Sequence, residues 1–407
     1  MNPIKVIYYR TYQFVLNKIC LPFLKIKEAE TIESDNCFDP ISTLLNKNKY
    51  KRPLLLLSNH LLTDPNYLKF INDCQSNDIE VISFANISSN PDVKQVDETY
   101  NLYLKNECDS LIAIGGGSIL DLAKAVGILV TNKKKDISKY KGLLKVKKRL
   151  PFLILVPTTA GTGSETTICS VISDGKKNDK YSITDPKLIP DYAILDNTLL
   201  KTLPESIIST TGMDALTHAV EAFLGNALTK KTKYCATTAI TLIYNNLYNF
   251  YSNKDDDDLA RKSMLKASYF AGVAFTRSYV GYVHALAHAL GGKYHVAHGL
   301  ANSILLPIVL KKYGKKAYKK LAFLADMLQL TAQSISEQEK AENFIKWIEN
   351  LNNSMNIPSK FNNLIKKEDL VFLVNHAYKE ANPLYPVIKE LDKNELKEIL
   401  IEAEETL

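Results

Sequence analysis

The 407-residue sequence predicts an N-terminal α/β domain built on a parallel sheet, followed by an all-α domain. In the first half, short apolar runs alternate with polar stretches of helical character. This pattern is typical of strands that helices cover on both faces. Beyond about residue 200, apolar residues recur at helical spacing and few strand candidates remain. We therefore predict domains over 1–200 and 201–407, with the linker near 198–204.

The predicted sheet consists of four apolar runs bounded by turn residues, namely 54–57, 79–84, 111–114 and 152–156. Residues 1–50 precede this sheet as an N-terminal extension. Within it, 8–24 is expected to form an amphipathic helix or a hairpin packed on the first domain, rather than a membrane anchor.

The predicted helical domain contains apolar residues at helical spacing over 215–223, 236–250, 259–275 and 305–330. Another helix is expected to carry His284 and His288. Gly291 and Gly292 are expected to end that helix, and His298-Gly299 to precede the next one.

The composition excludes several classes of protein. Hydrophobic residues make up 46% and charged residues 23%, as in ordinary globular proteins, and the net charge of +7 is too small to indicate a nucleic-acid partner. Without an apolar run of about 18 residues, no membrane span is expected. The six cysteines form no C-x-x-C pair, so we expect free thiols in a reducing cytoplasm.

Histidine is concentrated in two short segments that predict a metal site. Five of the seven histidines lie there together with an aspartate: Asp214, His218, His284, His288, His295 and His298. Asp214 and His218 are four residues apart, so they share one helix face and can hold one ion together. Spacing alone leaves open which three of the five imidazoles bind. A carboxylate with imidazoles and no thiolate suits Fe²⁺ or Zn²⁺ in a catalytic site.

Two loops at strand ends predict contacts with a nucleotide. The strand over 110–114 runs into Gly115-Gly116-Gly117-Ser118 and then a helix, where backbone N–H groups and the helix N-terminus favour a phosphate. By itself this motif also fits a tight strand–helix turn. A second loop, 157–165, rich in threonine and glycine, follows the strand over 152–156. Ligands of open α/β sheets bind at such strand ends.

Four segments, IGGGSILDLAKA, PTTAGTGSE, GMDALTHAVEAF and HALAHALGGKYHVAHGLANSILLP, resemble the iron-containing (group III) alcohol dehydrogenase family. The resemblance extends from about Leu54 to the C-terminus. It implies a Rossmann-like nucleotide-binding domain, a helical metal-binding domain, a cleft between them and a homodimer. It also implies metal ligation by Asp214, His218, His284 and His298, and it places His288 near the reaction centre instead. The cofactor contacts that it implies are Asn90, Gly116, Gly117, Ser118, Asp121, Thr158, Thr159, Thr162, Thr167 and Lys180.

The resemblance implies a metal-dependent alcohol dehydrogenase or aldehyde reductase, which transfers a hydride between a small alcohol or aldehyde and NAD(P)(H). Fe²⁺ is the expected metal, with Zn²⁺ as the alternative, and His288 either relays a proton or packs against the helix. A dehydroquinate-synthase-like reaction is the alternative on the same scaffold. The apolar residues that flank the metal motifs favour a small, weakly polar substrate over a sugar acid. A noncatalytic binding protein would leave both glycine- and threonine-rich loops unexplained.

One departure from the family pattern concerns nucleotide choice. Many members carry an aspartate against the adenosine ribose at the position of Asn59. An aspartate there accepts hydrogen bonds from the ribose 2′-hydroxyl and repels a 2′-phosphate. Asn59 is uncharged and does not repel a 2′-phosphate. We therefore expect it to contact the cofactor, and we expect the protein to use both NAD(H) and NADP(H), with a modest preference for NADP(H).

Overall fold

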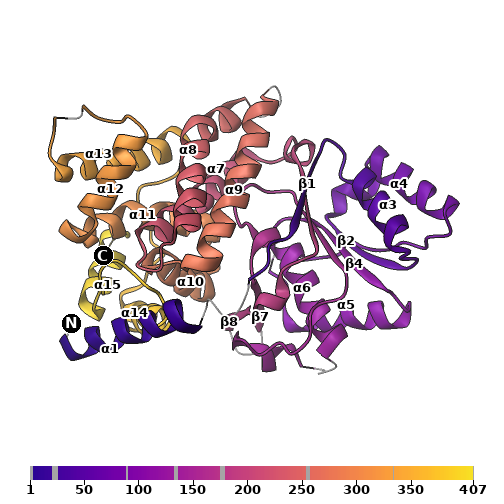
Figure 1. Cartoon of the computed structure of the whole chain (residues 1–407). Helices are drawn as coiled ribbons and strands as arrows, with labels where there is room; N and C mark the ends of the chain where they lie inside the picture. The colour runs from indigo at the N-terminus through magenta and orange to yellow at the C-terminus, as the bar shows by residue number, and fades with distance from the viewer. Residues whose placement is uncertain are drawn as a thin grey trace. The chain divides into compact units, whose positions relative to one another are not determined.

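A computed structural model of the chain describes residues 3–20, 26–88, 90–132, 136–174, 179–253, 257–332 and 334–406. The chain divides into two compact units: Ile26–Thr202, and Met1–Lys25 together with Leu203–Leu407 (Figure 1). The first unit is an α/β unit and the second is helical, which confirms the predicted fold class.

The α/β unit is built on a six-stranded sheet with the order β1-β9-β6-β4-β2-β3, in which every pairing is parallel. Its strands are β1 (Glu30–Ser34), β2 (Pro53–Leu57), β3 (Ile82–Phe84), β4 (Ser110–Gly115), β6 (Leu153–Pro157) and β9 (Tyr192–Asp196). The predicted apolar runs correspond to β2, β3, β4 and β6. Because β3 lies on one side of β2 and β4 on the other, the strand order reverses between β2 and β4.

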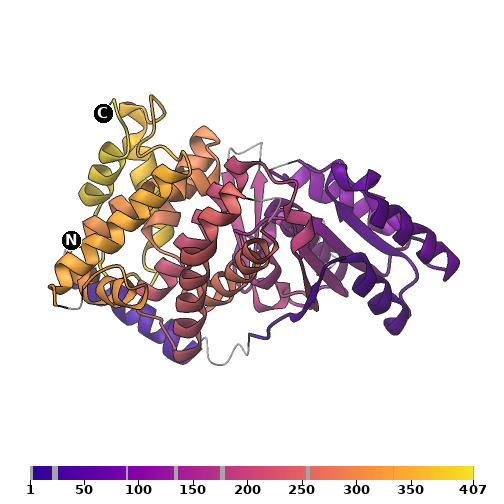
Figure 2. The ribbon, with the colours of Figure 1, turned by 90° about the horizontal axis from the view of Figure 1, so that it is seen from above.

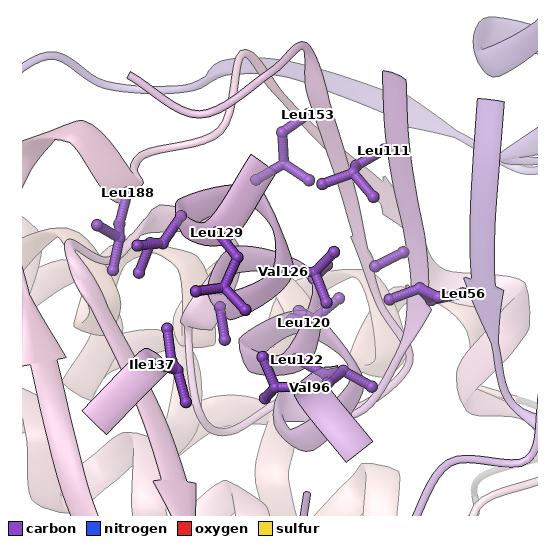
Figure 3. Packing of buried hydrophobic residues seen from close by; sticks show 14 of the residues in the cluster. Leu56, Val96, Leu111, Leu120, Leu122, Val126, Leu129, Ile137, Leu153 and Leu188 are labelled. Atoms are coloured by element: carbon purple, nitrogen blue, oxygen red, sulfur yellow. The ribbon is translucent and has the colours of Figure 1, made fainter. Parts of the chain in front are cut away.

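Helices cover both faces of this sheet (Figures 1 and 2). Leu54 and Leu56 of β2 face a core formed with α5 (Val93–Lys105) and α6 (Gly117–Asn132). The alternate residues of β2 face a second core with α3 (Phe38–Asn48) and α4 (Pro65–Ser76). Figure 3 shows strand leucines meeting the apolar side chains of α6 in the first core. Burial on both faces explains why β2, β4 and β6 are continuous apolar runs.

A smaller sheet in the same unit has the order β5-β8-β7. It consists of β5 (Gly142–Leu143), β7 (Cys169–Asp174) and β8 (Asp179–Thr184). The short 3₁₀ helices of the unit are η2 (Asn59–Thr63), η3 (Ile137–Tyr140), η4 (Ser164–Thr166), η5 (Pro186–Leu188) and η6 (Asn197–Leu200).

The helical unit consists of α1 (Pro3–Phe14), η1 (Val15–Cys20), α7 (Glu205–Leu224), α8 (Lys230–Ser252), α9 (Asp258–Ser278), α10 (Tyr282–Tyr294), α11 (His298–Tyr313), α12 (Lys315–Met327), α13 (Glu337–Ser354), η7 (Lys367–Asp369), α14 (Leu370–Ala381) and α15 (Lys393–Glu402). Two predicted boundaries are wrong. The run 305–330 is divided between α11 and α12, because Gly314 adopts a positive φ of 54°. Helix α10 continues through Gly291 and Gly292 and ends only where His295 adopts a φ of 57°.

The N-terminal helix α1 contacts the helical unit, and not the first domain as predicted (Figure 1). The Arg10 guanidinium donates to the backbone carbonyls of Val387 (2.5 Å) and Ile388 (3.2 Å) and pairs with Glu390. Gln13 is buried and donates to the backbone carbonyl of Tyr385 at 2.8 Å. These polar contacts with a C-terminal loop place α1 in the second unit. No described helix is both long and apolar enough to cross a membrane.

Candidate functional site

The loops predicted to bind a nucleotide lie at one edge of the large sheet. Since β2, β4 and β6 are parallel, the segments that follow Leu57, Gly115 and Pro157 all leave the sheet at the same edge. This edge includes the position where the strand order reverses between β2 and β4. In open α/β folds that position is where ligands bind.

The glycine loop and the threonine loop are in close contact. A Cβ atom on Gly117 would lie 2.8 Å from Thr162 Cγ2 and 2.9 Å from its Oγ1, so a side chain there would require Thr162 to move. A Cβ on Gly116 would meet Thr159 Cγ2 at 3.6 Å. Gly117 also begins α6, so Thr162 lies beside a helix N-terminus, where backbone N–H groups favour an anion.

Asp121, predicted to contact the cofactor, already makes hydrogen bonds within the α/β unit. Its carboxylate accepts from the Ser164 hydroxyl at 2.7 Å and from the Val171 backbone N–H at 3.0 Å. Its backbone carbonyl accepts from the Ser170 hydroxyl at 2.8 Å. These contacts show Asp121 connecting α6 to the segment that follows the threonine loop.

The other predicted cofactor residues differ in their exposure to solvent. Thr158 and Thr167 are buried, while Asn59 and Asn90 are exposed. Asn59 begins η2 directly after β2, as expected for a residue at the carboxyl edge. Lys180 lies in β8, but its side chain is outside the described part of the chain.

Three helices of the second unit bring the four predicted metal ligands together. Asp214 and His218 are on α7, His284 is on α10, and His298 is the first residue of α11. Asp214, His284 and His298 form a group of ligand atoms that all lie within 4.8 Å of one another. His218 stacks on His284 with ring centroids 4.5 Å apart.

The distances between these atoms fit a common ion. From Asp214 Oδ1 the Nε2 atoms lie at 3.5 Å (His298), 3.6 Å (His284) and 4.0 Å (His218). Bonds of about 2.0–2.2 Å to a tetrahedral ion place ligand atoms roughly 3.4 Å apart. The donor set of one carboxylate and three imidazoles therefore suits a divalent transition metal.

The protonation of the group reflects its burial and its charges. Burial alone would raise the pKa of Asp214, but the His218 and His298 imidazoles hold it well below its ordinary value. Burial lowers the pKa of His298 far below its ordinary value. For His284 burial acts in the same direction, but hydrogen bonds with Asp214 and Glu221 raise its pKa to about 9. The carboxylate thus stays ionised and available to a cation.

Known proteins share both units. Residues 29–197 match the family model "Iron-containing alcohol dehydrogenase", and residues 208–403 match "Fe-containing alcohol dehydrogenase family, C-terminal". The chain belongs to the iron-containing alcohol dehydrogenase family. It is an oxidoreductase that acts on alcohols, and these matches do not favour the dehydroquinate-synthase-like alternative.

Individual relatives of this dehydrogenase agree with the assignment. The NAD-dependent methanol dehydrogenase of Bacillus methanolicus is 34% identical over 77% of this chain and 83% of its own length. The NADPH-dependent butanol dehydrogenase of Clostridium saccharobutylicum is 33% identical over 79% of this chain and 83% of its own. The crystal structure of a 1,3-propanediol oxidoreductase matches with a TM-score of 0.88 and 30% identity, over 93% of this chain and 99% of that one.

Glu221 and Asn302 adjoin the ligands of this dehydrogenase, and sequence reasoning missed both. Glu221 Oε2 lies 2.6 Å from His284 Nδ1, and the same carboxylate accepts the backbone N–H groups of Gly281 and Val283 at 2.8 Å each. The Asn302 amide nitrogen donates to Asp214 Oδ1 at 2.7 Å and lies 3.1 Å from His298 Nε2. A signal for Glu221 was present, because it follows His218 by three residues on α7 and so shares its face.

His288 lies beside the ligand group without belonging to it. Its ring stacks on His298 with centroids 5.0 Å apart, while its Nδ1 lies 2.7 Å from Glu380 Oε1. Glu380 also accepts from the Tyr385 hydroxyl at 2.8 Å. His295, the fifth clustered histidine, is exposed at the end of α10.

Proposed function

We propose that the enzyme transfers a hydride between a small alcohol or aldehyde and NAD(P)(H), at a metal held by Asp214, His218, His284 and His298. The observation that carries this proposal is the approach of three imidazole nitrogens from α7, α10 and α11 to within 3.5–4.0 Å of Asp214 Oδ1. A bound divalent metal supplies Lewis acidity that polarises the substrate oxygen.

The residues around the ligands have distinct parts in this proposal. Glu221 holds the His284 ring through Nδ1, which leaves Nε2 for the metal. Glu380 holds Nδ1 of His288 in the same way, so the other ring nitrogen is left to take or give the substrate proton. In the α/β unit, Thr158, Thr159 and the N-terminus of α6 bind the pyrophosphate.

We propose iron as the physiological metal, with zinc as the competing occupant. The family match supports iron. Zn²⁺ generally binds nitrogen and oxygen sites more tightly than Fe²⁺, so zinc is expected to enter during purification. Zinc-loaded enzyme that turned over faster than iron-loaded enzyme without oxygen would overturn this choice.

We propose that both nicotinamide cofactors are used, with a modest preference for NADP(H). The uncharged Asn59 at the end of β2 supports this, because it places no negative charge against a 2′-phosphate. One NAD-dependent and one NADPH-dependent dehydrogenase are similar to this chain to nearly the same degree.

We also propose a homodimer in the cytoplasm. The family resemblance supports the dimer, which light scattering on the purified enzyme would measure. Among the described cysteines, Cys37, Cys74, Cys108, Cys169 and Cys235 are free thiols, in keeping with a reducing compartment.

The test of the proposed function is turnover by protein loaded with Fe²⁺ in the absence of oxygen. Oxidation of NADPH and NADH would be followed with a panel of short aldehydes, and the His284→Ala variant would serve as the control without a complete ligand set. We expect turnover by the wild type and none by the variant. Wild type that oxidises neither cofactor with any aldehyde, but releases phosphate from a sugar phosphate, would overturn the proposal.

A further inference from the structure

A buried lysine holds a segment, residues 164–168, that begins at the end of the threonine loop (157–165) and leads into β7. Lys124, on the second turn of α6, is fully buried. Its ammonium donates to the backbone carbonyls of Ser164 (2.6 Å), Thr167 (2.9 Å) and Cys169 (2.9 Å). An ammonium has three N–H groups, so these three carbonyls satisfy all of them. The Thr167 hydroxyl at 3.1 Å is a further contact.

Asp121 adds to this attachment from one turn earlier on the same helix. Because Asp121 and Lys124 are three residues apart, they lie on one face of α6. Asp121 accepts from the hydroxyl of Ser164, whose carbonyl accepts from Lys124. Asp121 thus holds Ser164 by its hydroxyl, and Lys124 holds it by its backbone carbonyl.

The segment depends on these contacts for its conformation. Residues 164–168 lie between β6 and β7 and contain only the 3₁₀ turn η4. The Ser164 carbonyl accepts a backbone hydrogen bond from the Thr167 N–H, and the Ile168 carbonyl accepts one from the Asp185 N–H. Buried carbonyl groups require a donor. Lys124 supplies donors for two carbonyls of this segment and for that of Cys169, the first residue of β7.

Glu165 is a second buried ionisable group that acts electrostatically on Lys124. It is fully buried, and no described residue, Lys124 included, donates a hydrogen bond to its carboxylate oxygens. Burial raises its pKa to about 7, although the charge of Lys124 acts in the opposite direction.

We propose that Lys124 is a positioning residue for the nucleotide, acting by fixing the threonine loop against the glycine loop. This inference rests on the proposed function. The two loops approach so closely that a side chain at Gly117 would require Thr162 to move. Lys124 extends from the helix that begins at Gly117 and holds Ser164 and Thr167 on the other side. It therefore sets the distance between the two groups of N–H and hydroxyl donors that the nucleotide must contact at once.

Three variants of the full chain test this inference. Lys124→Met keeps an unbranched side chain that is one atom shorter and removes the donors. Ser164→Ala is milder, since it removes only the hydroxyl that Asp121 accepts. Ser170→Ala is the matched control, because it removes a hydrogen bond to the same helix but from β7, outside the loop.

The measurements separate positioning from general stability. Calorimetric titration with NADPH and NADH gives the Kd of the folded protein, and kinetics give KM for nucleotide and aldehyde separately. We expect Lys124→Met to raise the nucleotide Kd and KM by about tenfold or more, and Ser164→Ala by a smaller factor in the same direction. Ser170→Ala, the aldehyde KM and the metal content should stay as in the wild type.

The outcomes are distinguishable. Wild type that binds neither nucleotide would overturn the proposed function itself. Wild-type affinity in Lys124→Met would overturn the positioning role alone. If Lys124→Met does not fold, Ser164→Ala decides, and an unchanged Kd in that variant overturns the inference. An equal rise of the nucleotide Kd in Ser164→Ala and Ser170→Ala would also overturn the inference. It would show that the loss of any contact with α6 is enough to weaken nucleotide binding.

Discussion

Replacing Glu165 by glutamine should change how the stability of the α/β unit depends on pH. The carboxyl group is fully buried, and burial raises its pKa from the ordinary 4.5 to about 7. Between these two values the folded chain keeps its proton while the unfolded chain releases it. The free energy of the unfolded state therefore falls relative to that of the folded state as the pH rises, and the wild type loses stability across this window.

The size of the effect follows from the shift of the pKa. At 1.36 kcal/mol per unit, a shift from 4.5 to about 7 corresponds to about 3 kcal/mol in total. This contribution of Glu165 to the free energy of unfolding is fully present below pH 4.5 and has been lost above pH 7. Glu165→Gln has no proton to exchange, so its stability relative to wild type should rise by this amount across the window and then stay constant.

Hydrogen exchange measures this locally in the full-length protein. Amide protection of peptides from β4 and β6, corrected for the intrinsic pH dependence of exchange, would be compared between pH 4.5 and 8. Glu98→Gln, at an exposed position on α5, is the control and should follow the wild type. Parallel profiles for wild type and Glu165→Gln would refute the reasoning, because they would show that Glu165 has the same pKa in the folded and unfolded chains.

Four further substitutions test the two sites. His284→Ala should abolish bound metal in elemental analysis while the α/β unit stays folded, and full occupancy would remove this residue from the site. Glu221→Gln should weaken metal affinity by about 10- to 100-fold in chelator competition, because the His284 ring loses the carboxylate that orients it; equal affinities would limit Glu221 to capping α10. His288→Ala should lower turnover at unchanged metal content, whereas wild-type turnover would make it a packing residue. Asn59→Asp should shift the ratio of kcat/KM values toward NAD by about tenfold or more, and strict use of NAD by the wild type would show that selection lies elsewhere.

The parallel sheet could be predicted because its strands are buried on both faces. Leu54, Leu55, Leu56 and Leu57 alternate between two cores, so all four had to be apolar. Strand β1 (Glu30–Ser34) escaped prediction because it is an edge strand without an apolar run. Strand β9 (Tyr192–Asp196) is not among the four predicted apolar runs either.

The ligand helices could be predicted from residue spacing, but their surroundings could not. Asp214 and His218 lie one helical turn apart, and such spacing is visible in a sequence. Asn302 reaches Asp214 from another helix, across 88 positions of sequence, and Glu380 reaches His288 across 92. Contacts of this kind depend on how helices pack, so no local pattern indicates them. The same holds for Arg10, which binds the Glu390 carboxylate and two backbone carbonyls far along the sequence.

The helical unit is interrupted in sequence by the whole α/β unit, and this has a consequence for synthesis of the chain. Residues 26–202 are continuous, so the ribosome releases all of them before most of the helical unit exists. Arg10, by contrast, must find a carbonyl 377 positions later. Helix α1 is therefore made before residues 26–202, but the loop that holds it is made only after most of the helical unit. Until residues 385–390 have been translated, Arg10 and Gln13 lack the partners that hold α1, so the helix stays undocked and open to chaperones or to another nascent chain.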